Sequence, residues 1–99
     1  MSKIPSKTIQ RIMAKPEAEL DLHGLTKQQA EIELDDFLIK AEKLGWQKIR
    51  IIVGRGWNSP GHKSILRDFI TDKLDNYGYN YTNAKIKQGG EGVLIVALY

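Results

Sequence analysis

The sequence predicts an α/β fold, a two-layer α/β sandwich with the element order β-α-β-α-β-β and a mixed four-stranded sheet. Two observations lead to this prediction. Short apolar segments alternate with two stretches of helical spacing, and right-handed crossovers make the first strands parallel. A glycine-rich turn before the last apolar segment then predicts a closing antiparallel hairpin. A chain of 99 residues is long enough for one such domain.

The first strand and helix are predicted from residues 20–45. Residues 20–23 alternate between leucine and a polar residue, which is the period of a strand and places Asp21 and His23 on one face. Thr26 with Gln29 three residues later is a capping box, and Gly45 supplies a left-handed stop. Apolar residues follow at helical spacing between these signals. We therefore expect a helix of about 18 residues.

The remaining elements follow the same reasoning. Ile49–Val53 is a β-branched run, which predicts a strand buried on both sides. Ser59 and Pro60 are candidates for the start of a second amphipathic helix, which Asn76 and Gly78 end. Beyond it, the segment around residues 79–86 and the apolar run 93–98 predict the last two strands. Three tyrosines near the third strand are expected on its surface or in a hydrophobic cover, namely Tyr77, Tyr79 and Tyr81.

Composition excludes several classes of protein. The chain has 15 basic and 12 acidic residues, 41% hydrophobic residues and no cysteine, which excludes a disulfide scaffold, a thiol nucleophile and a cysteine zinc site. No apolar run approaches the ~18–20 residues that cross a bilayer, and the first residues lack the apolar core of a signal peptide. We therefore expect a cytoplasmic protein without membrane contact.

Charge is distributed unevenly along the chain. Met1–Pro16 carries four basic side chains and Gly45–Arg67 carries five, and neither stretch has an acidic residue. Glu17–Leu44, in contrast, has eight acidic residues against three lysines. This pattern is typical of a small protein that binds phosphate backbones, although a solvated surface with random clustering explains it equally well. We divide the chain into a basic N-terminal extension, residues 1–17, and a domain, residues 18–99.

The best candidates for catalytic residues follow the first two strands. Ligands of βαβ folds gather beyond the carboxyl ends of parallel strands, and here these ends carry His23 and Arg55. A histidine exchanges protons near neutral pH, and Asp21 could orient it. Arg55 stands between Gly54 and Gly56, where a guanidinium can reach a phosphate that backbone amides also approach. The combination suits phosphodiester chemistry.

Other site patterns are absent or open to two interpretations. Residue 59 is serine, so the glycine turn is no dinucleotide fingerprint, and no nucleophile-elbow pattern supports a serine triad. Neither histidine has metal-ligand spacing, so we predict no resident metal site. Trp57 could stack on a base or cover the sheet edge. Trp46 is expected in the core.

Three segments resemble the Smr (small MutS-related) domain family. Residues 20–26, LDLHGLT, are similar to its L-D-L-H-G-x-T motif, residues 51–56 to its G-x-G loop, and residues 89–92 to its G-G-x-G motif. Together they cover about 80 residues, from Glu19 to Leu98. Val53 departs from the family, which commonly has His or Thr before the G-x-G. The resemblance implies a fold similar to the C-terminal domain of a bacterial translation initiation factor.

The resemblance also implies nucleic-acid binding and, in several members, endonuclease activity. Some members nick DNA, and others cleave RNA, including messenger RNA on stalled or collided ribosomes. We therefore predict an RNA- or DNA-cleaving endonuclease, which would need a divalent cation such as Mg²⁺ or Mn²⁺ if DNA is the substrate. The alternatives are a non-catalytic nucleic-acid or ribosome-binding module and a protein adaptor that uses the N-terminal extension. Candidate catalytic residues are Asp21, His23 and Arg55, and candidate nucleic-acid contacts are Gly54, Arg55, Gly56, Trp57, Asn58, Ser59, Lys63 and Arg67.

Overall fold

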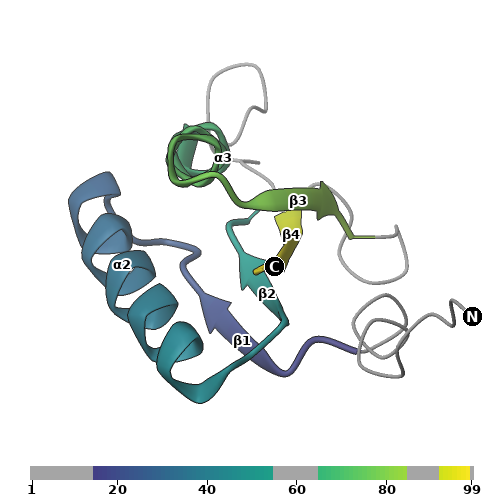
Figure 1. The fold of residues 1–99 in the computed structure, drawn as a ribbon. Helices are drawn as coiled ribbons and strands as arrows, with labels where there is room; N and C mark the ends of the chain where they lie inside the picture. Colours follow the sequence, from purple (N-terminus) through teal and green to yellow (C-terminus); the bar gives the residue numbers. More distant parts are fainter. Residues whose placement is uncertain (1–14, 55–64, 85–91, 99) are drawn as a thin grey trace, which may run out of the picture.

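Four strands and two helices make up the fold (Figure 1). The computed structural model describes residues 15–54, 65–84 and 92–98. The elements, in chain order, are β1 (Ala18–Asp21), α2 (Lys27–Leu44), β2 (Lys48–Ile52), α3 (Ile65–Tyr77), β3 (Asn80–Asn83) and β4 (Val93–Ala97). This is the predicted β-α-β-α-β-β order.

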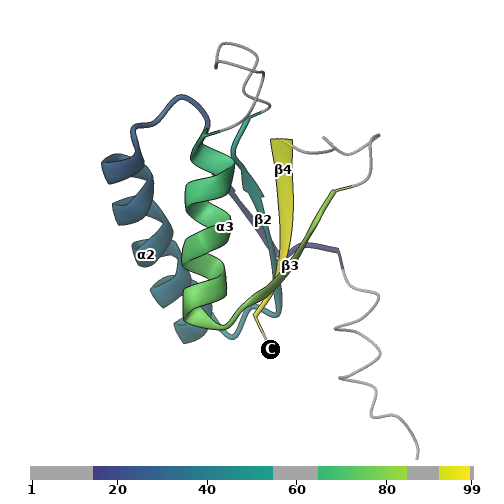
Figure 2. The same cartoon turned by 90° about the horizontal axis from the view of Figure 1, so that it is seen from above.

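The sheet is mixed, as the sequence predicts. Its strand order is β1-β2-β4-β3, with β1 parallel to β2, and β4 antiparallel to both β2 and β3. Both helices lie on the same face of the sheet, which makes two layers (Figure 2). The α/β sandwich is therefore confirmed.

Strong local signals set the bounds of α2. The Thr26 hydroxyl accepts a hydrogen bond from the Gln29 amide at 3.1 Å, and the Gln29 side chain accepts one from the Thr26 amide at 3.1 Å. At the other end, Gly45 has φ +72° and its amide donates to carbonyls of the last turn. The capping box and the glycine stop are both confirmed, and the helix has the expected 18 residues.

The hydrophobic core lies between the helices and one face of the sheet. Leu22, which follows β1, and Ile49 and Ile51 of β2 are fully buried, as are Leu34 of α2 and Leu74 of α3. Trp46 packs against this core as expected, and its ring lies 5.4 Å from that of Phe37.

Two predictions from sequence were wrong in detail. The second strand is not buried on both sides: Ile49 and Ile51 are buried, whereas Lys48, Arg50 and Ile52 alternate with them and are only partly buried. The reason is that α2 and α3 both cover the same sheet face. Tyr77 does not lie on the surface of the third strand either, because it is the last residue of α3, whereas Tyr79 and Tyr81 pack against the core as the predicted hydrophobic cover. The start of the second helix at Ser59 and Pro60 lies outside the described residues.

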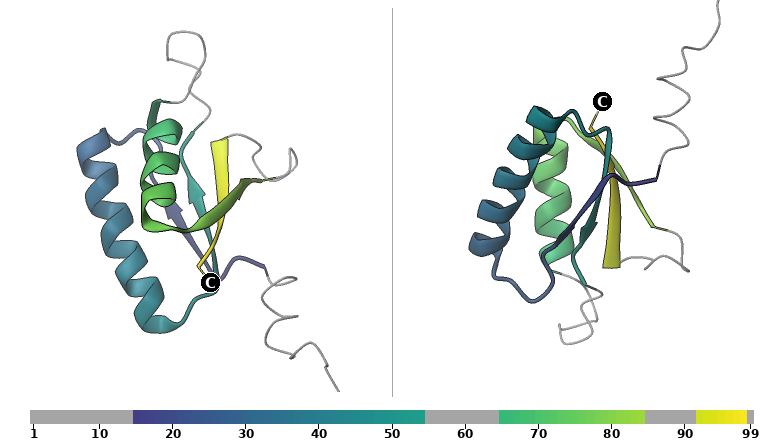
Figure 3. Two further views of the ribbon diagram at one scale, coloured as in Figure 1. Left: turned by 45° about the horizontal axis from the view of Figure 1, so that its top comes forward. Right: turned by 90° about the horizontal axis from the view of Figure 1, so that it is seen from below.

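One end of the sheet gathers the elements that matter for function. Parallel pairing places the carboxyl ends of β1 and β2 at the same edge, and β3, which like β2 runs antiparallel to β4, ends there too. The two helices begin at this end (Figure 3). We call this the carboxyl edge of the sheet.

Candidate nucleic-acid interface

The carboxyl ends of β1 and β2 bring His23 next to the glycine turn. The Leu22 amide donates to the Ile52 carbonyl at 2.8 Å, which continues the parallel pairing past the end of both strands. A Cβ built on Gly54 would lie 3.5 Å from the Cβ of His23. Gly54 has φ +83°, a conformation that favours glycine. The predicted juxtaposition of the two strand ends is therefore present up to Gly54.

Asp21 holds His23 by two contacts. Its Oδ1 atom accepts a hydrogen bond from the His23 amide at 3.1 Å and also contacts Nδ1 of the imidazole. The hydrogen bond from the ring holds the pKa of Asp21 below its usual value. A carboxylate only accepts hydrogen bonds, so the proton of a neutral His23 ring belongs on Nδ1. The other ring nitrogen, Nε2, is then left to accept a proton from a substrate.

Both side chains of this pair face solvent. The His23 side chain is 66% exposed and that of Asp21 is 48% exposed. A histidine of the core would be buried, with both ring nitrogens occupied by protein groups. The exposure of this ring therefore favours contact with an external ligand over a purely structural role.

Gly92 joins the start of β4 to this edge. Its carbonyl accepts hydrogen bonds from the amides of Val53 and Gly54, at 2.9 and 3.1 Å. Gly92 is itself buried. The last residues before the glycine loop are thus fixed between His23 on one side and the start of β4 on the other.

Arg67 lies at the carboxyl edge on the first turn of α3. Its Nη2 atom donates a hydrogen bond to Oδ1 of Asn83, the last residue of β3, at 2.5 Å. The prediction from sequence named Arg67 but missed Asn83. Only the packing of α3 beside β3 brings these two residues together, and no local pattern indicates it.

Val53 faces the core. Its side chain is only 3% exposed and belongs to the main hydrophobic cluster. The position at which Smr domains commonly have His or Thr is therefore filled by an apolar side chain that packs inward. The remaining predicted site residues lie outside the described residues, namely Arg55, Gly56, Trp57, Asn58, Ser59 and Lys63.

The described residues offer neither a cluster of metal-binding side chains nor a helix that could span a membrane. Within residues 15–54, 65–84 and 92–98, no group of three or more His, Cys, Asp or Glu side chains is placed to hold a metal ion. Neither of the two described helices is sufficiently long and apolar to cross a membrane.

Known proteins share this fold and these motifs. The family model of the Smr domain matches residues 20–99. The chain belongs to the Smr domain family. Among curated proteins, it is 35% identical over 92 residues to "Endonuclease MutS2" of Thermus thermophilus, a match that covers 88% of this chain and 12% of that protein. The chain therefore corresponds to a small part of these MutS2 proteins.

Two solved structures support the same assignment. The Smr domain of Thermus thermophilus MutS2 has a TM-score of 0.70 and 33% identity, covering 81% of this chain and 95% of that domain. YdaL, a stand-alone small MutS-related protein from Escherichia coli, has a TM-score of 0.76 and 25% identity, covering 90% of this chain and 71% of that one. The chain thus has the fold of both an appended and a stand-alone Smr domain.

Proposed function

We propose that this protein binds nucleic acid and cleaves it as an endonuclease, with RNA as the preferred substrate. The observation that carries the proposal is the exposed Asp21–His23 pair beside Gly54 at the carboxyl edge. Homology to the Smr domain of proteins named endonucleases supports the same reaction class. Ribosome-bound messenger RNA is one candidate form of the substrate, and the cytoplasm is the corresponding location.

His23 would act as the general base. Its Nε2 atom accepts the proton of an RNA 2′-hydroxyl, and the 2′-oxygen then attacks the adjacent phosphorus. The bond between the 2′-oxygen and phosphorus forms, the bond between phosphorus and the 5′-oxygen breaks, and the leaving oxygen takes a proton from solvent. The products are a 2′,3′-cyclic phosphate and a 5′-hydroxyl. Asp21 serves as the positioning residue because its contact with Nδ1 holds the ring and its tautomer.

Arg55 would stabilise the charge that develops on the phosphate oxygens. It directly follows Gly54 in the sequence, and Gly54 itself lies beside His23. A guanidinium offers two parallel hydrogen bonds to a phosphate. The neighbouring loop residues and Arg67 would hold the flanking backbone, since phosphate contacts fix the position of a nucleic acid without reading its sequence.

RNA is preferred because its own hydroxyl supplies the nucleophile. DNA lacks the 2′-hydroxyl, so water must attack and a divalent cation is usually needed. A histidine base held by an aspartate, together with an arginine that binds the phosphate, is sufficient for transesterification.

A non-catalytic nucleic-acid or ribosome-binding module is the second candidate, favoured by Val53. Its buried side chain cannot make the polar contact that His or Thr would offer at this position. Binding of nucleic acid by the basic stretch 45–67 does not require that contact. In this case His23→Ala would leave affinity unchanged.

Cleavage assays with four arms for each substrate separate these possibilities. A labelled RNA and a supercoiled plasmid are incubated with wild-type protein and with His23→Ala, each with and without EDTA. We expect RNA cleavage that resists EDTA and that His23→Ala abolishes. Ribosome-bound RNA is tested in the same way.

Each alternative outcome has a distinct meaning. Plasmid nicking that EDTA stops would assign DNA as the substrate and contradict the RNA preference. Binding without cleavage of any substrate would overturn the endonuclease and leave the binding module. Cleavage that persists in His23→Ala would exclude His23 as the base. Asp36→Asn, at an exposed carboxylate on α2, controls for the charge change in a parallel Asp21→Asn assay.

A further inference from the structure

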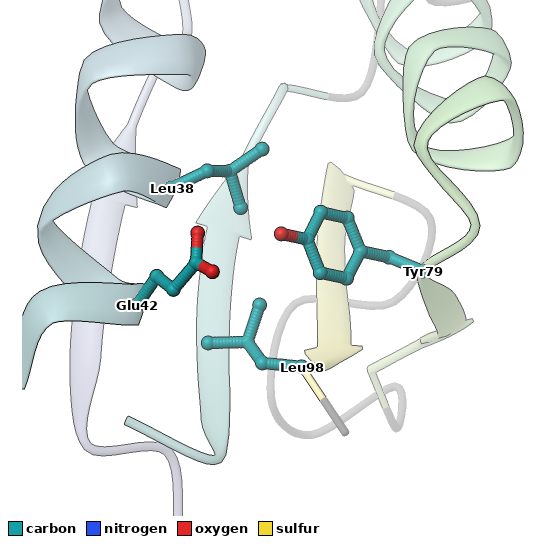
Figure 4. A pocket seen from close by; sticks show the side chains of 4 residues that line it. All are labelled: Leu38, Glu42, Tyr79 and Leu98. Atoms are coloured by element: carbon teal, nitrogen blue, oxygen red, sulfur yellow. The ribbon is translucent and has the colours of Figure 1, made fainter. Parts of the chain in front are cut away.

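A groove lies at the end of the molecule opposite the carboxyl edge. It runs between the C-terminal half of α2 and the segment that connects α3 to β3, and its volume is about 350 Å³. A smaller hollow continues it toward Leu98, which follows β4 (Figure 4). The Leu98 amide donates to the carbonyl of Gln47, just before β2, at 3.0 Å. The described residues that line the groove are Asp35, Leu38, Ile39, Glu42, Tyr77 and Tyr79.

The groove exposes large apolar side chains. Ile39 is 53% exposed and Tyr77 is 45% exposed, although neighbouring Leu38 is almost fully buried. Leu38 and Tyr79 point into the hollow from opposite sides in Figure 4. Gathered apolar surface of this kind marks an interaction site more often than single scattered residues do.

Its charge is negative. Two carboxylates, those of Asp35 and Glu42, line the groove, and none of its described lining residues is basic. Asp35 is already engaged, because it accepts a hydrogen bond from the Tyr77 hydroxyl at 2.7 Å and lies 3.8 Å from Nζ of Lys73. The side chain of Glu42, in contrast, makes no ion pair or hydrogen bond with any residue that the structure describes.

Glu42 stands at a position where its charge does not stabilise α2. It stands in the last turn of α2, where the negative end of the helix dipole disfavours a carboxylate. A cationic group brought to Glu42 by a partner would remove this penalty. A phosphate backbone, in contrast, would be repelled by both carboxylates. The groove is therefore suited to a polypeptide with positive charge and unsuited to nucleic acid.

We propose that this groove docks a basic amphipathic segment of a partner protein. A large apolar side chain of the partner packs on Leu38, Ile39 and Tyr79, and a neighbouring lysine or arginine pairs with Glu42. Because the groove and the carboxyl edge lie at opposite ends of the sheet, the protein can hold such a partner and a nucleic acid at once.

The test uses NMR titration of the full chain with two synthetic peptides. The first is a 14-residue helical peptide with leucine at positions i, i+3, i+4 and i+7 and lysine elsewhere. The second has serine in place of each leucine. We expect the first peptide to shift the signals of Leu38, Ile39 and Tyr79, and the second to bind at least about tenfold more weakly, since burial of several methyl groups is lost.

A matched pair of charge reversals tests the role of Glu42. Glu42→Lys should raise the Kd of the leucine peptide about tenfold, because it replaces an attractive contact with a repulsive one. Glu33→Lys makes the same change of charge on the opposite side of α2, at an exposed residue outside the groove, and should change the Kd less than about twofold. Circular dichroism confirms that both variants fold.

Three outcomes would overturn the proposal. Equal weakening by the two charge reversals, or equal binding of the serine peptide, would mean attraction by overall charge alone. Shifts confined to other surfaces would place the peptide elsewhere. If sedimentation shows that the unliganded chain dimerises and that Ile39→Asp stops it, the groove is occupied by a second copy of this chain and not by a basic partner.

Discussion

The most informative single residue is Asp21, because it acts on His23 through both the backbone and the ring. Its hydrogen bond from the His23 amide fixes the turn after β1, and its contact with Nδ1 fixes the imidazole. An exposed histidine without such a partner would rotate freely and exchange tautomers. Asp21 therefore converts an exposed ring into an oriented one.

Replacing this carboxylate should redistribute the proton on His23. In Asp21→Asn the amide oxygen can accept a hydrogen bond from a protonated Nδ1 and the amide NH₂ can donate one to an unprotonated Nδ1, so the Nδ1-protonated form loses its preference. Long-range ¹H–¹⁵N spectra in mildly alkaline solution should show one tautomer in the wild type and a mixture in the variant. Asp36→Asn serves as the control and should match the wild type. An unchanged tautomer in Asp21→Asn would remove Asp21 from its positioning role.

Asn83 is expected to position Arg67 in the same way. Asn83→Ala removes the acceptor that lies 2.5 Å from the guanidinium, which leaves the charge of Arg67 in place but removes one contact that orients it. We expect RNA affinity to fall about fivefold, equivalent to about 1 kcal/mol, with the salt dependence of binding unchanged. Fluorescence anisotropy measures both quantities.

Asn80→Ala supplies the matched control, because Asn80 is an exposed asparagine at the other end of β3. Its affinity for RNA should equal that of the wild type. If Arg67→Ala itself leaves affinity unchanged, Arg67 does not contact RNA, and the role given to Asn83 fails with it.

At the scale of elements, local sequence signals predicted the bounds of a helix correctly. The sequence did not predict which faces of the sheet are covered. The bounds of α2 were predictable because a capping box and a left-handed glycine act within one turn of the helix. The run Ile49–Val53 identifies a strand but carries no information about how many layers cover it. Two helices on one face leave the other face of β2 partly exposed.

In the candidate site, too, some contacts could be predicted from the sequence and others depend on how distant elements pack. Asp21, His23 and Gly54 could be placed together from sequence, since neighbouring parallel strands end at one edge. The bond between Arg67 and Asn83 could not, because it depends on where β3 lies relative to α3. Val53 was recognised as a departure from the family, yet only the packing of β2 shows its side chain turned into the core.

The capping box gives a prediction at the scale of α2. Thr26→Ala leaves the amide of Gln29 without its acceptor, so we expect the free energy of unfolding to fall by about 1 kcal/mol. Urea denaturation followed by circular dichroism measures the change. Gln28→Ala, one position from the cap partner on the exposed side, should alter stability by less than about 0.5 kcal/mol. Equal effects of the two substitutions would show that the cap contributes nothing.

At the scale of the whole molecule, charge and topology divide the surface in two. Two acidic residues of α2, Asp35 and Glu42, line the groove, while the basic stretch 45–67 includes Gly54, which lies beside His23 at the carboxyl edge. Acidic side chains next to a bound polyanion would repel it and weaken its binding. Salt screens this repulsion over the Debye length, which is about 8 Å at physiological salt, so the repulsion falls as the acidic side chains lie farther from the polyanion. Separation to opposite ends limits this cost.

This separation predicts how salt acts on nucleic-acid binding. Each lysine or arginine that neutralises a phosphate releases counterions, so the logarithm of the association constant for single-stranded RNA falls with the logarithm of salt concentration, by about 0.7 per contact. Lys63→Ala should therefore weaken binding and make this slope shallower by about 0.7. Lys43→Ala removes the same charge from the acidic helix and should leave the slope unchanged. If the two substitutions flatten the slope equally, RNA responds to the net charge of the protein, and no basic surface at the carboxyl edge is needed to explain its binding.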